Sequence, residues 1–380
     1  MRRESWLAAA GYLCLFASGF SDNARGPLFP KIIESFKVTD AECSLLVVIG
    51  SLAGLPGSLA AGALVARSGP RATMRLSGAL VALGLLLVAA SGLVAFFPLV
   101  PIGAGVLGLG LGGLGVCANA CVALATPPER RARALALLHV TYAVASLIVP
   151  LAIDAAAKLA RWPFVLGAVA LVPLALLPAS ISVPDPEKPA DEKAAEKAAR
   201  AKAPLGVVVP YALVVSCFVV AEVAVSVWIV LYAARVKSPW PGPVLLAGFF
   251  VGLGAARALG GALLRAEMLR PVIAAAALLT AGLVLLGLHV DALFLSFAGL
   301  TAGILFPATV TALTLELAPE HHGPAIGVVS GAYSAALGGA HALIGKISDA
   351  RGLEVALHVS PICALAGVAV FLFHTRRRNP

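Results

Sequence analysis

Long apolar runs and short polar connections alternate along the whole chain. Twelve of the runs are long enough to cross the roughly 30 Å hydrocarbon core of a bilayer as helices. We place them at residues 6–29, 42–65, 72–95, 98–124, 134–157, 163–182, 206–233, 242–264, 271–289, 291–317, 324–347 and 355–373. Because lipid offers the backbone no hydrogen-bond partners, each run must satisfy its own as a helix. The pattern predicts an all-α membrane protein with twelve transmembrane helices.

One long polar stretch, VPDPEKPADEKAAEKAARAKAP at residues 183–204, interrupts this pattern near the midpoint. It holds ten of the 47 acidic and basic residues of the chain, and six apolar runs lie on each side of it. We therefore expect a six-helix bundle at 1–182, a cytosolic linker at 183–204 and a second six-helix bundle at 205–380. The linker is rich in helix formers, and Glu196 and Arg200 can pair at i,i+4. A surface helix and a loose tether both remain open.

The two halves repeat each other weakly. Pro128 and Glu129 open one loop, and Tyr142 follows thirteen residues after the glutamate; Pro319-Glu320 and Tyr333 show the same spacing in the second half. Internal symmetry of this kind is typical of secondary transporters, whose site lies between the repeats. We expect two pseudo-symmetric bundles with a site at their interface.

Composition and charge support this interpretation. With 60% hydrophobic and 12% charged residues, the chain cannot form an ordinary water-soluble core. Its net charge of +9 is spread over short loops, which argues against nucleic acid as a partner. Eighteen Lys and Arg residues fall in one alternating set of loops and eight in the other. By the positive-inside rule both termini and the linker are cytosolic.

Three charged residues inside the spans are candidates for proton coupling or gating, since charge in a bilayer is costly. Asp22 and Arg25 share a helix face at i,i+3 and can pair. Glu222 lies centrally in span 7, with no other charge from Leu205 to Ala234. Burial without a partner favours a protonated carboxyl, so we expect Glu222 to be the better proton carrier. The alternative is a pair of static contacts that lock helices together.

Further polar and aromatic residues lie on spans expected to line a central cavity. Sugars are bound by aromatic faces and by hydrogen-bonding side chains. The candidate substrate-binding residues are Tyr12, Asn23, Asn119, His139, Tyr142, Trp228 and Tyr232. Packing between helices is the alternative role for the aromatic residues and for His139. Arg257 in span 8 either contacts an anionic group or extends its charge toward the membrane surface.

Other patterns do not predict a cofactor or metal. Gly103, Gly105 and Gly108 match GxGxxG, but no strand precedes them and the glycines continue to Gly115, which favours close helix packing over a nucleotide site. Cys117 and Cys121 share a helix face without a placed His or acidic partner. The sequence has no HExxH or GxSxG motif, so we do not expect an enzyme.

The loop between spans 2 and 3, from Gly62 to Arg71, is similar to the GxxxDRxGRR signature of the major facilitator superfamily. Gly62, Arg67, Gly69 and Arg71 match, whereas Ala66 replaces the acidic residue. The resemblance covers the chain and implies the fold of that family and a conformational switch at this loop.

Within the superfamily the chain most resembles fucose-permease-like sugar symporters, through residues 16–30, Asn119, residues 137–150 and residues 219–232. The proton-coupling carboxylates of fucose permease correspond to Gly26 and Gly115 here, so its proton pathway does not carry over. Of the drug-exporter motif GxxxGPxxGG in span 5, Pro150 alone remains.

We therefore expect a secondary transporter that moves a small polar organic solute, with sugars among the candidates, by alternating access coupled to protons. Its partners would be the solute, protons and the lipid bilayer. Efflux of amphipathic or drug-like compounds is a second hypothesis, and a non-transporting membrane sensor is a third. We expect a monomeric multi-pass protein of a bacterial cytoplasmic (inner) membrane.

Overall fold

The computed structural model describes residues 2–183, 204–263 and 266–376, and all regular secondary structure in these ranges is helical. The helices of the first half are α1 (Arg2–Asn23), α2 (Arg25–Phe36), α3 (Asp40–Val94), α4 (Leu99–Ala125), α5 (Pro128–Ala157), α6 (Trp162–Val169), α7 (Leu171–Leu174), α8 (Leu176–Ala179) and η1 (Ser180–Ser182). The second half contains α10 (Leu205–Arg235), α11 (Gly242–Leu263), η2 (Ala266–Met268), α12 (Leu269–His289), α13 (Leu293–Leu315), α14 (Pro319–Arg351), α15 (Leu353–Leu357) and α16 (Val359–Arg376). Residues 184–203 of the predicted linker lie outside the described residues.

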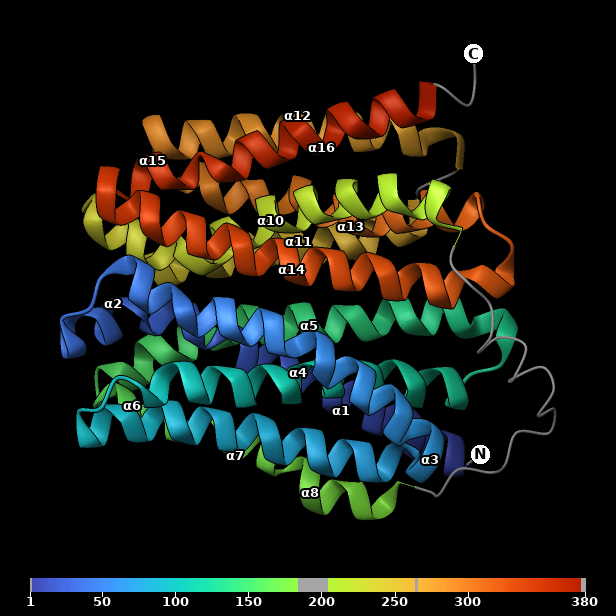
Figure 1. Cartoon of the computed structure of the whole chain (residues 1–380), viewed down its shortest axis with the longest axis horizontal. Helices are drawn as coiled ribbons and strands as arrows, with labels where there is room; N and C mark the ends of the chain where they lie inside the picture. Colours follow the sequence, from blue (N-terminus) through green and yellow to red (C-terminus); the bar gives the residue numbers. More distant parts are fainter. Residues whose placement is uncertain (1, 184–203, 264–265, 377–380) are drawn as a thin grey trace.

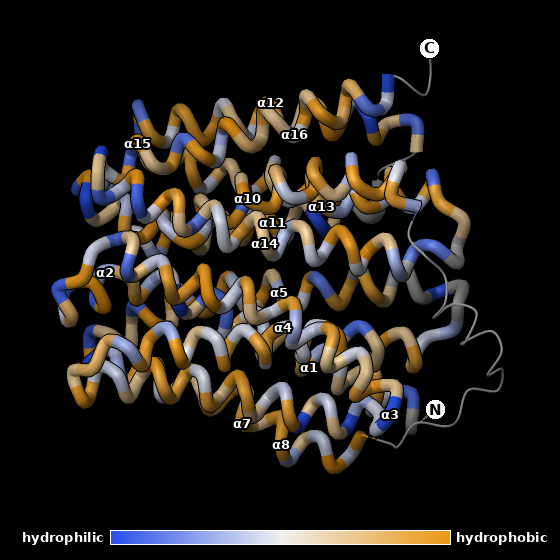
Figure 2. Tube along the Cα trace, viewed as in Figure 1, coloured by the Kyte–Doolittle hydropathy of each residue, from blue (hydrophilic) through white to orange (hydrophobic). Residues whose placement is uncertain are grey.

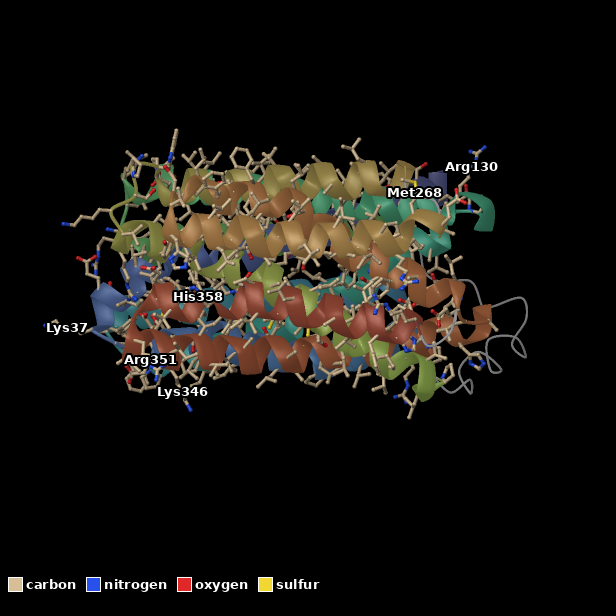
Figure 3. All side chains as sticks on the ribbon, turned by 90° about the horizontal axis from the view of Figure 1, so that it is seen from above. Lys37, Arg130, Met268, Lys346, Arg351 and His358 are labelled. Carbon is tan, nitrogen blue, oxygen red and sulfur yellow. The ribbon has the colours of Figure 1, made fainter. Side chains whose placement is uncertain are left out.

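The long helices run side by side, with the first half in the lower part of Figure 1 and the second half in the upper part. The start of α1 and the end of α16 lie at one end of the molecule, here called the termini end, and the opposite end is the far end. Hydrophilic residues gather at both ends while the helix middles are mostly hydrophobic (Figure 2). Lys37, Lys346 and Arg351 lie at the far end and Arg130 at the termini end (Figure 3). The two predicted sets of basic loops are represented at opposite ends.

Ten helices of the described residues are long and apolar enough to cross a membrane. One of them, α3, has 55 residues, and its length of about 82 Å would exceed two bilayer cores if it were straight. Its helical geometry breaks at Gly69, whose φ of 79° lies in the left-handed region that glycine tolerates. Pro70 follows, so α3 contains predicted spans 2 and 3. The first predicted span is divided into α1 and α2, and its membrane crossing stays a prediction.

The glycine-rich α4 packs against both parts of α3. A methyl group at Gly108 would lie 2.1 Å from the carbonyl oxygen of Gly50, and one at Gly112 would lie 2.1 Å from that of Gly54. These backbones are therefore in direct contact, which small residues permit in membrane helices. The glycines from Gly103 to Gly113 serve helix packing, as their sequence context favours, whereas a methyl group at Gly115 would meet no atom within 4 Å.

The two halves meet through three helix pairs, α3 with α14, α5 with α11 and α2 with α10. On α14 three glycines at seven-residue spacing face α3. A methyl group at each would contact α3: Gly331 against Leu55, Gly338 against Leu52, and Gly345 against Ala41 and Ser44. A methyl group at Gly345 would lie only 2.7 Å from the Ala41 Cα, so α3 and α14 approach most closely toward the far end.

The repeat seen in the sequence corresponds to two helices of the interface. Both α5 and α14 begin at the repeated proline, Pro128 in one and Pro319 in the other. The N–H of a first helical residue has no partner within the helix, so proline, which lacks this N–H, is well tolerated there. Tyr142 and Tyr333 lie at the same distance along their helices. The repeated segments therefore occupy related positions in the fold, one in each half.

Candidate functional site

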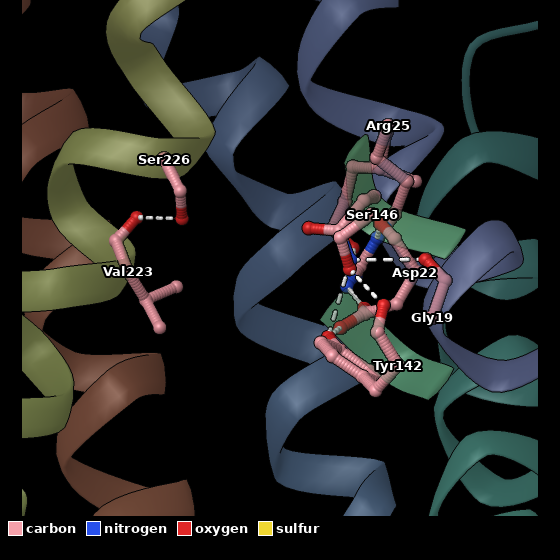
Figure 4. Close-up of polar contacts among 9 residues, drawn as sticks. Gly19, Asp22, Arg25, Tyr142, Ser146, Val223 and Ser226 are labelled. Atoms are coloured by element: carbon pink, nitrogen blue, oxygen red, sulfur yellow. Dashed lines mark hydrogen bonds and ion pairs between the residues drawn. The ribbon is translucent and has the colours of Figure 1, made fainter. Parts of the chain in front are cut away.

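A buried polar cluster joins the end of α1 to α5. Arg25 forms an ion pair with Asp22, as their spacing predicts, and the Tyr142 hydroxyl donates to the other Asp22 oxygen at 2.9 Å. The Asn23 amide donates to the Tyr142 hydroxyl at 3.2 Å and to Ser146 Oγ at 2.8 Å. Figure 4 shows this cluster on one side and Val223 and Ser226 of α10 across from it. The structure thus brings two predicted binding residues, Asn23 and Tyr142, into contact, and it adds Ser146, which the sequence did not suggest.

The break between α1 and α2 positions this cluster. Pro27 lacks the backbone N–H that would bond to the Asn23 carbonyl and continue α1, and the chain turns at Ala24 between the two segments. Arg25 is thereby oriented back toward α1, where its Nε donates to the Asp22 carbonyl at 3.0 Å. Its Nη1 reaches the Leu46 carbonyl of α3 at 3.1 Å. Arg25 is held by its own half of the molecule and does not bridge two carboxylates.

Glu222 has an arginine partner, which corrects the prediction of an unpaired carboxyl. Nη2 of Arg257 donates to both Glu222 oxygens, at 2.9 and 3.2 Å, and the two side chains are 14% and 17% exposed. The partner comes from α11, 35 residues further along the chain. Arg257 therefore does not extend to the membrane surface. Opposite charges in the consecutive spans 7 and 8 were the sequence signal for this pair.

The two ion pairs lie near the contact between the halves. Gly26, next to Arg25, packs against the α10 backbone, where a methyl group would lie 3.0 Å from the Val227 carbonyl oxygen. Gly254, one turn before Arg257, lies against α5, where a methyl group would lie 3.1 Å from the Ala143 Cβ. Arg257 also acts electrostatically on Tyr142 and His139 of α5. Charged groups of both halves thus converge on α5.

Trp228 and Tyr232 occupy packed positions instead of presenting their rings to this region. Trp228 is fully buried; its Nε1 donates to His341 Nδ1 at 3.0 Å, and its ring meets Phe29 edge to face at 5.2 Å. The Tyr232 hydroxyl donates to the Leu288 carbonyl at 3.0 Å on α12. Both aromatic residues stabilise helix contacts, which is the alternative role raised from the sequence.

The other predicted binding residues are spread along the first half. Tyr12 is partly buried, and its hydroxyl lies 3.5 Å from the Ala134 carbonyl oxygen of α5. Asn119 is exposed and donates to the Gly115 carbonyl of its own helix at 2.8 Å. The His139 side chain is exposed, one turn before Ala143. Arg257 acts electrostatically on His139, and the substrate contacts of all three residues remain predictions.

Arginines at and just after the predicted switch loop bond to the end of the first half, at residues 180–183. Arg71 Nε donates to the Val183 carbonyl at 2.7 Å, and Arg75 Nε donates to Ser180 Oγ at 2.6 Å. Gly62 and Arg67 are exposed, and Gly69 forms the break in α3. A switching role for Gly62, Arg67, Gly69 and Arg71 therefore stays a prediction.

An ion-pair network at the far end, which the sequence did not suggest, joins the two halves. Arg235 at the end of α10 donates to both oxygens of the buried Asp40 at 2.5 Å, and Ser348 of α14 also donates to Asp40. In the reverse direction, Asp349 of α14 accepts from the backbone N–H groups of Asp40 and Ala41, at 2.8 and 3.1 Å. We call Asp40, Arg235, Ser348 and Asp349 the far-end latch.

Within the described residues, no group of three or more His, Cys, Asp and Glu residues is arranged to hold a metal ion. Cys117 and Cys121 are both buried, with their Sγ atoms 4.0 Å apart. The polar chemistry of the membrane-spanning region is therefore that of paired charges and hydrogen bonds.

Comparison with known proteins identifies the fold. FucP, the fucose:proton symporter of E. coli, matches in its outward conformation with a TM-score of 0.65 and 19% identity, over 96% of this chain and 98% of that chain. The inward-open structure of the xylose transporter XylE from E. coli matches with a TM-score of 0.74 and 14% identity, over 96% and 94%. A search of curated protein sequences finds no significant match.

At these identities the structural matches establish the fold alone. The sequence itself provides the assignment, since the family model described as "Major Facilitator Superfamily" matches residues 11–339. That range extends from α1 into α14 and includes both partly buried ion pairs. The chain therefore belongs to the major facilitator superfamily.

Proposed function

We propose that this protein is a proton-coupled secondary transporter of a small polar organic solute, with its termini end facing the cytosol. The observation that supports this most is the placement of two ion pairs, one in each half, where the halves meet on α5. Buried charge in a membrane is costly and marks the path of a solute or ion. A protein that served only as a scaffold would gain little from retaining both pairs.

The far-end latch supports a rocking movement of the two halves. It joins them with charged hydrogen bonds at one end. Contacts that hold one end closed and that can be broken suit alternating access, in which two bundles move about a central site. The division of the chain at residues 183–204 into two moving units is part of this proposal.

A reversible crosslink across α3 and α14 tests the proposal. Leu52→Cys with Gly338→Cys, in a background without native cysteines, places two thiols where these helices touch. The full chain is reconstituted in liposomes and tested for counterflow with sugars, organic acids, amino acids, nucleosides and amphipathic drugs. We expect oxidation to stop counterflow of the active solute and reduction to restore it.

Leu52→Cys with Gly339→Cys is the matched control, because Gly339 faces away from other atoms. That pair should neither crosslink nor respond to oxidation. Counterflow that continues at full rate through the crosslinked Leu52→Cys/Gly338→Cys protein would contradict alternating access. A lack of counterflow with every solute would favour the sensor hypothesis, and activity restricted to amphipathic drugs would favour efflux.

A further inference from the structure

The guanidinium of Arg257 has hydrogen-bonding capacity that the described residues do not use. Both bonds to Glu222 come from Nη2. The Nε atom is buried and has no hydrogen-bond partner in the described part of the chain. Buried donors in folded proteins are nearly always paired, so an unpaired one at a site is unusual. It is a position where a ligand atom would gain a bond without displacing a protein group.

The cluster around Asp22 differs in this respect, because its members bond to one another. Arg25 uses Nε, Nη1 and Nη2 within its own half, and Tyr142 both donates and accepts a hydrogen bond. Arg257, in contrast, offers a planar donor edge, which matches the geometry of a carboxylate. Of the two arginines, Arg257 is the one with an unused buried nitrogen in the described part of the chain, so the capacity to bind an anion lies on the second half.

Charge determines what accompanies such a ligand. Arg257 and Glu222 together are neutral, so a carboxylate added beside them would leave one excess negative charge in an apolar environment. A proton on Glu222 removes that excess and also releases Nη2 for the ligand. The titratable groups on which Arg257 also acts electrostatically are His139 and Tyr142 of α5, and Tyr142 in turn donates to Asp22. None of these bonds directly to Glu222 within the described residues.

We propose that the transported solute is an organic acid whose carboxylate binds Arg257, and that the coupled proton is carried by Glu222 of the same ion pair. This inference rests on the proposed transport function and narrows its solute class from polar solutes in general to carboxylates. Binding of the carboxylate favours binding of the proton, and the reverse, because together they leave the charge of the site unchanged. The Arg257 and Glu222 side chains are 17% and 14% exposed, so the pair is not fully enclosed by protein.

Thermal unfolding of the purified full chain with matched probes tests the ligand class. Each acid is paired with the alcohol of the same skeleton: lactate with propane-1,2-diol, glucuronate with glucose, and benzoate with benzyl alcohol. A ligand that binds the folded state raises the Tm. We expect at least one acid to raise it while its alcohol does not, and the shift to be larger at pH 6 than at pH 8.

Variants connect this binding to the ion pair. Arg257→Gln and Arg257→Lys should lose the acid-dependent shift, and Arg75→Gln, which alters an arginine bonded to Ser180, should keep it. Should Arg257→Gln not fold with Glu222 left unpaired, the double variant Arg257→Gln/Glu222→Gln restores neutrality. Proton uptake in weak buffer gives an independent measurement. We expect about one proton per acid bound in the unmodified protein and none in Glu222→Gln.

Failure of every acid to raise the Tm would overturn the proposal, as would an acid-dependent shift that persists in the Arg257 variants. Counterflow of a neutral solute by a protein that binds none of the acids would overturn it too, yet would leave the transport function intact. Absence of counterflow for acids and neutral solutes alike would instead contradict both.

Discussion

Each of the two carboxylates near the centre of the molecule is held by an arginine, but the two pairs differ in how they are made. Asp22 and Arg25 lie three residues apart across a helix break, and Tyr142 also donates to the aspartate. Glu222 depends on one arginine of a neighbouring helix, with an unpaired Nε beside it. The first pair is thus a supported part of the structure, and the second is the one better suited to changing partners.

Glu222→Gln should separate proton coupling from solute movement. The amide keeps the shape of the side chain and its acceptor oxygen for Arg257 but cannot carry a proton. We expect loss of proton-driven accumulation while exchange of solute across the membrane persists, measured in liposomes with and without a pH gradient. Accumulation at the unmodified level in this variant would show that another group carries the proton.

Asp22→Asn should mainly affect stability, because it leaves the buried Arg25 without a balancing charge. Removing one partner of a fully buried pair costs roughly 3–5 kcal/mol; the Asp22 side chain is 30% exposed, so the cost is lower here, but the Tm should still fall measurably. The matched control is Asp154→Asn, which removes the exposed pair with Lys158. A pair of that kind contributes about 0.3–0.5 kcal/mol, and its loss should leave the Tm almost unchanged. Equal Tm values for both variants would contradict the structural role of Asp22.

At the scale of helices, the glycines of α14 determine how closely the two halves approach. Gly345 faces the backbone of α3 at Ala41, whereas a methyl group at Gly339 on the same helix would have no atom within 4 Å. The requirement for small residues is therefore confined to one face of α14.

Gly345→Ala and Gly339→Ala form a matched pair that tests this requirement. Both replace a glycine by a better helix former, a gain of about 1 kcal/mol each. The Gly345 methyl group would contact the Ala41 Cα at 2.7 Å, so this variant should close poorly at the far end and show slower counterflow. Gly339→Ala should match the unmodified rate. Similar rates for the two variants would show that α3 and α14 need not touch during transport.

Local patterns were sufficient to predict an all-helical chain with most of its spans, the break near Gly69 and the Asp22–Arg25 pair, because each depends on residues close in sequence. Partners brought together by packing were not predictable in the same way. Arg257 reaches Glu222 over 35 residues, and Trp228 reaches His341 over 113. An isolated sequence gives no register between such helices, so Trp228 and Tyr232 were assigned to a binding site although they pack between helices.

At the scale of the whole molecule, the far-end latch fixes how the two halves meet. Asp40 comes from the first half, whereas Arg235, Ser348 and Asp349 come from the second. Because the Asp40 side chain is only 4% exposed, its charged hydrogen bonds have little competition from water. Opening of this end must break all of these bonds together.

Asp40→Asn should shift the equilibrium toward a state open at the far end. Hydrogen bonds to charged groups contribute about 1.5–3 kcal/mol, and about 1.4 kcal/mol is a tenfold change in an equilibrium constant. Spin labels at Lys37→Cys and Lys346→Cys, exposed positions on different halves at the far end, report the distance between the halves. We expect a longer distance in Asp40→Asn. Glu34→Gln, an exposed acid outside the latch, should not change it, and identical distributions in all three proteins would exclude a gating role for Asp40.

The beginning of α3 allows the latch to be broken and made again without unfolding. A helix start leaves its first backbone N–H groups without internal partners. Here Thr39 and Glu42 bond to each other's N–H within the chain, while Asp349 from the other half accepts those of Asp40 and Ala41. When the far end opens, the local pair still defines where the helix begins and water can take the place of Asp349. The beginning of α3 therefore keeps its structure while the far end is open. Closing then requires only that the halves dock again, without refolding of this segment.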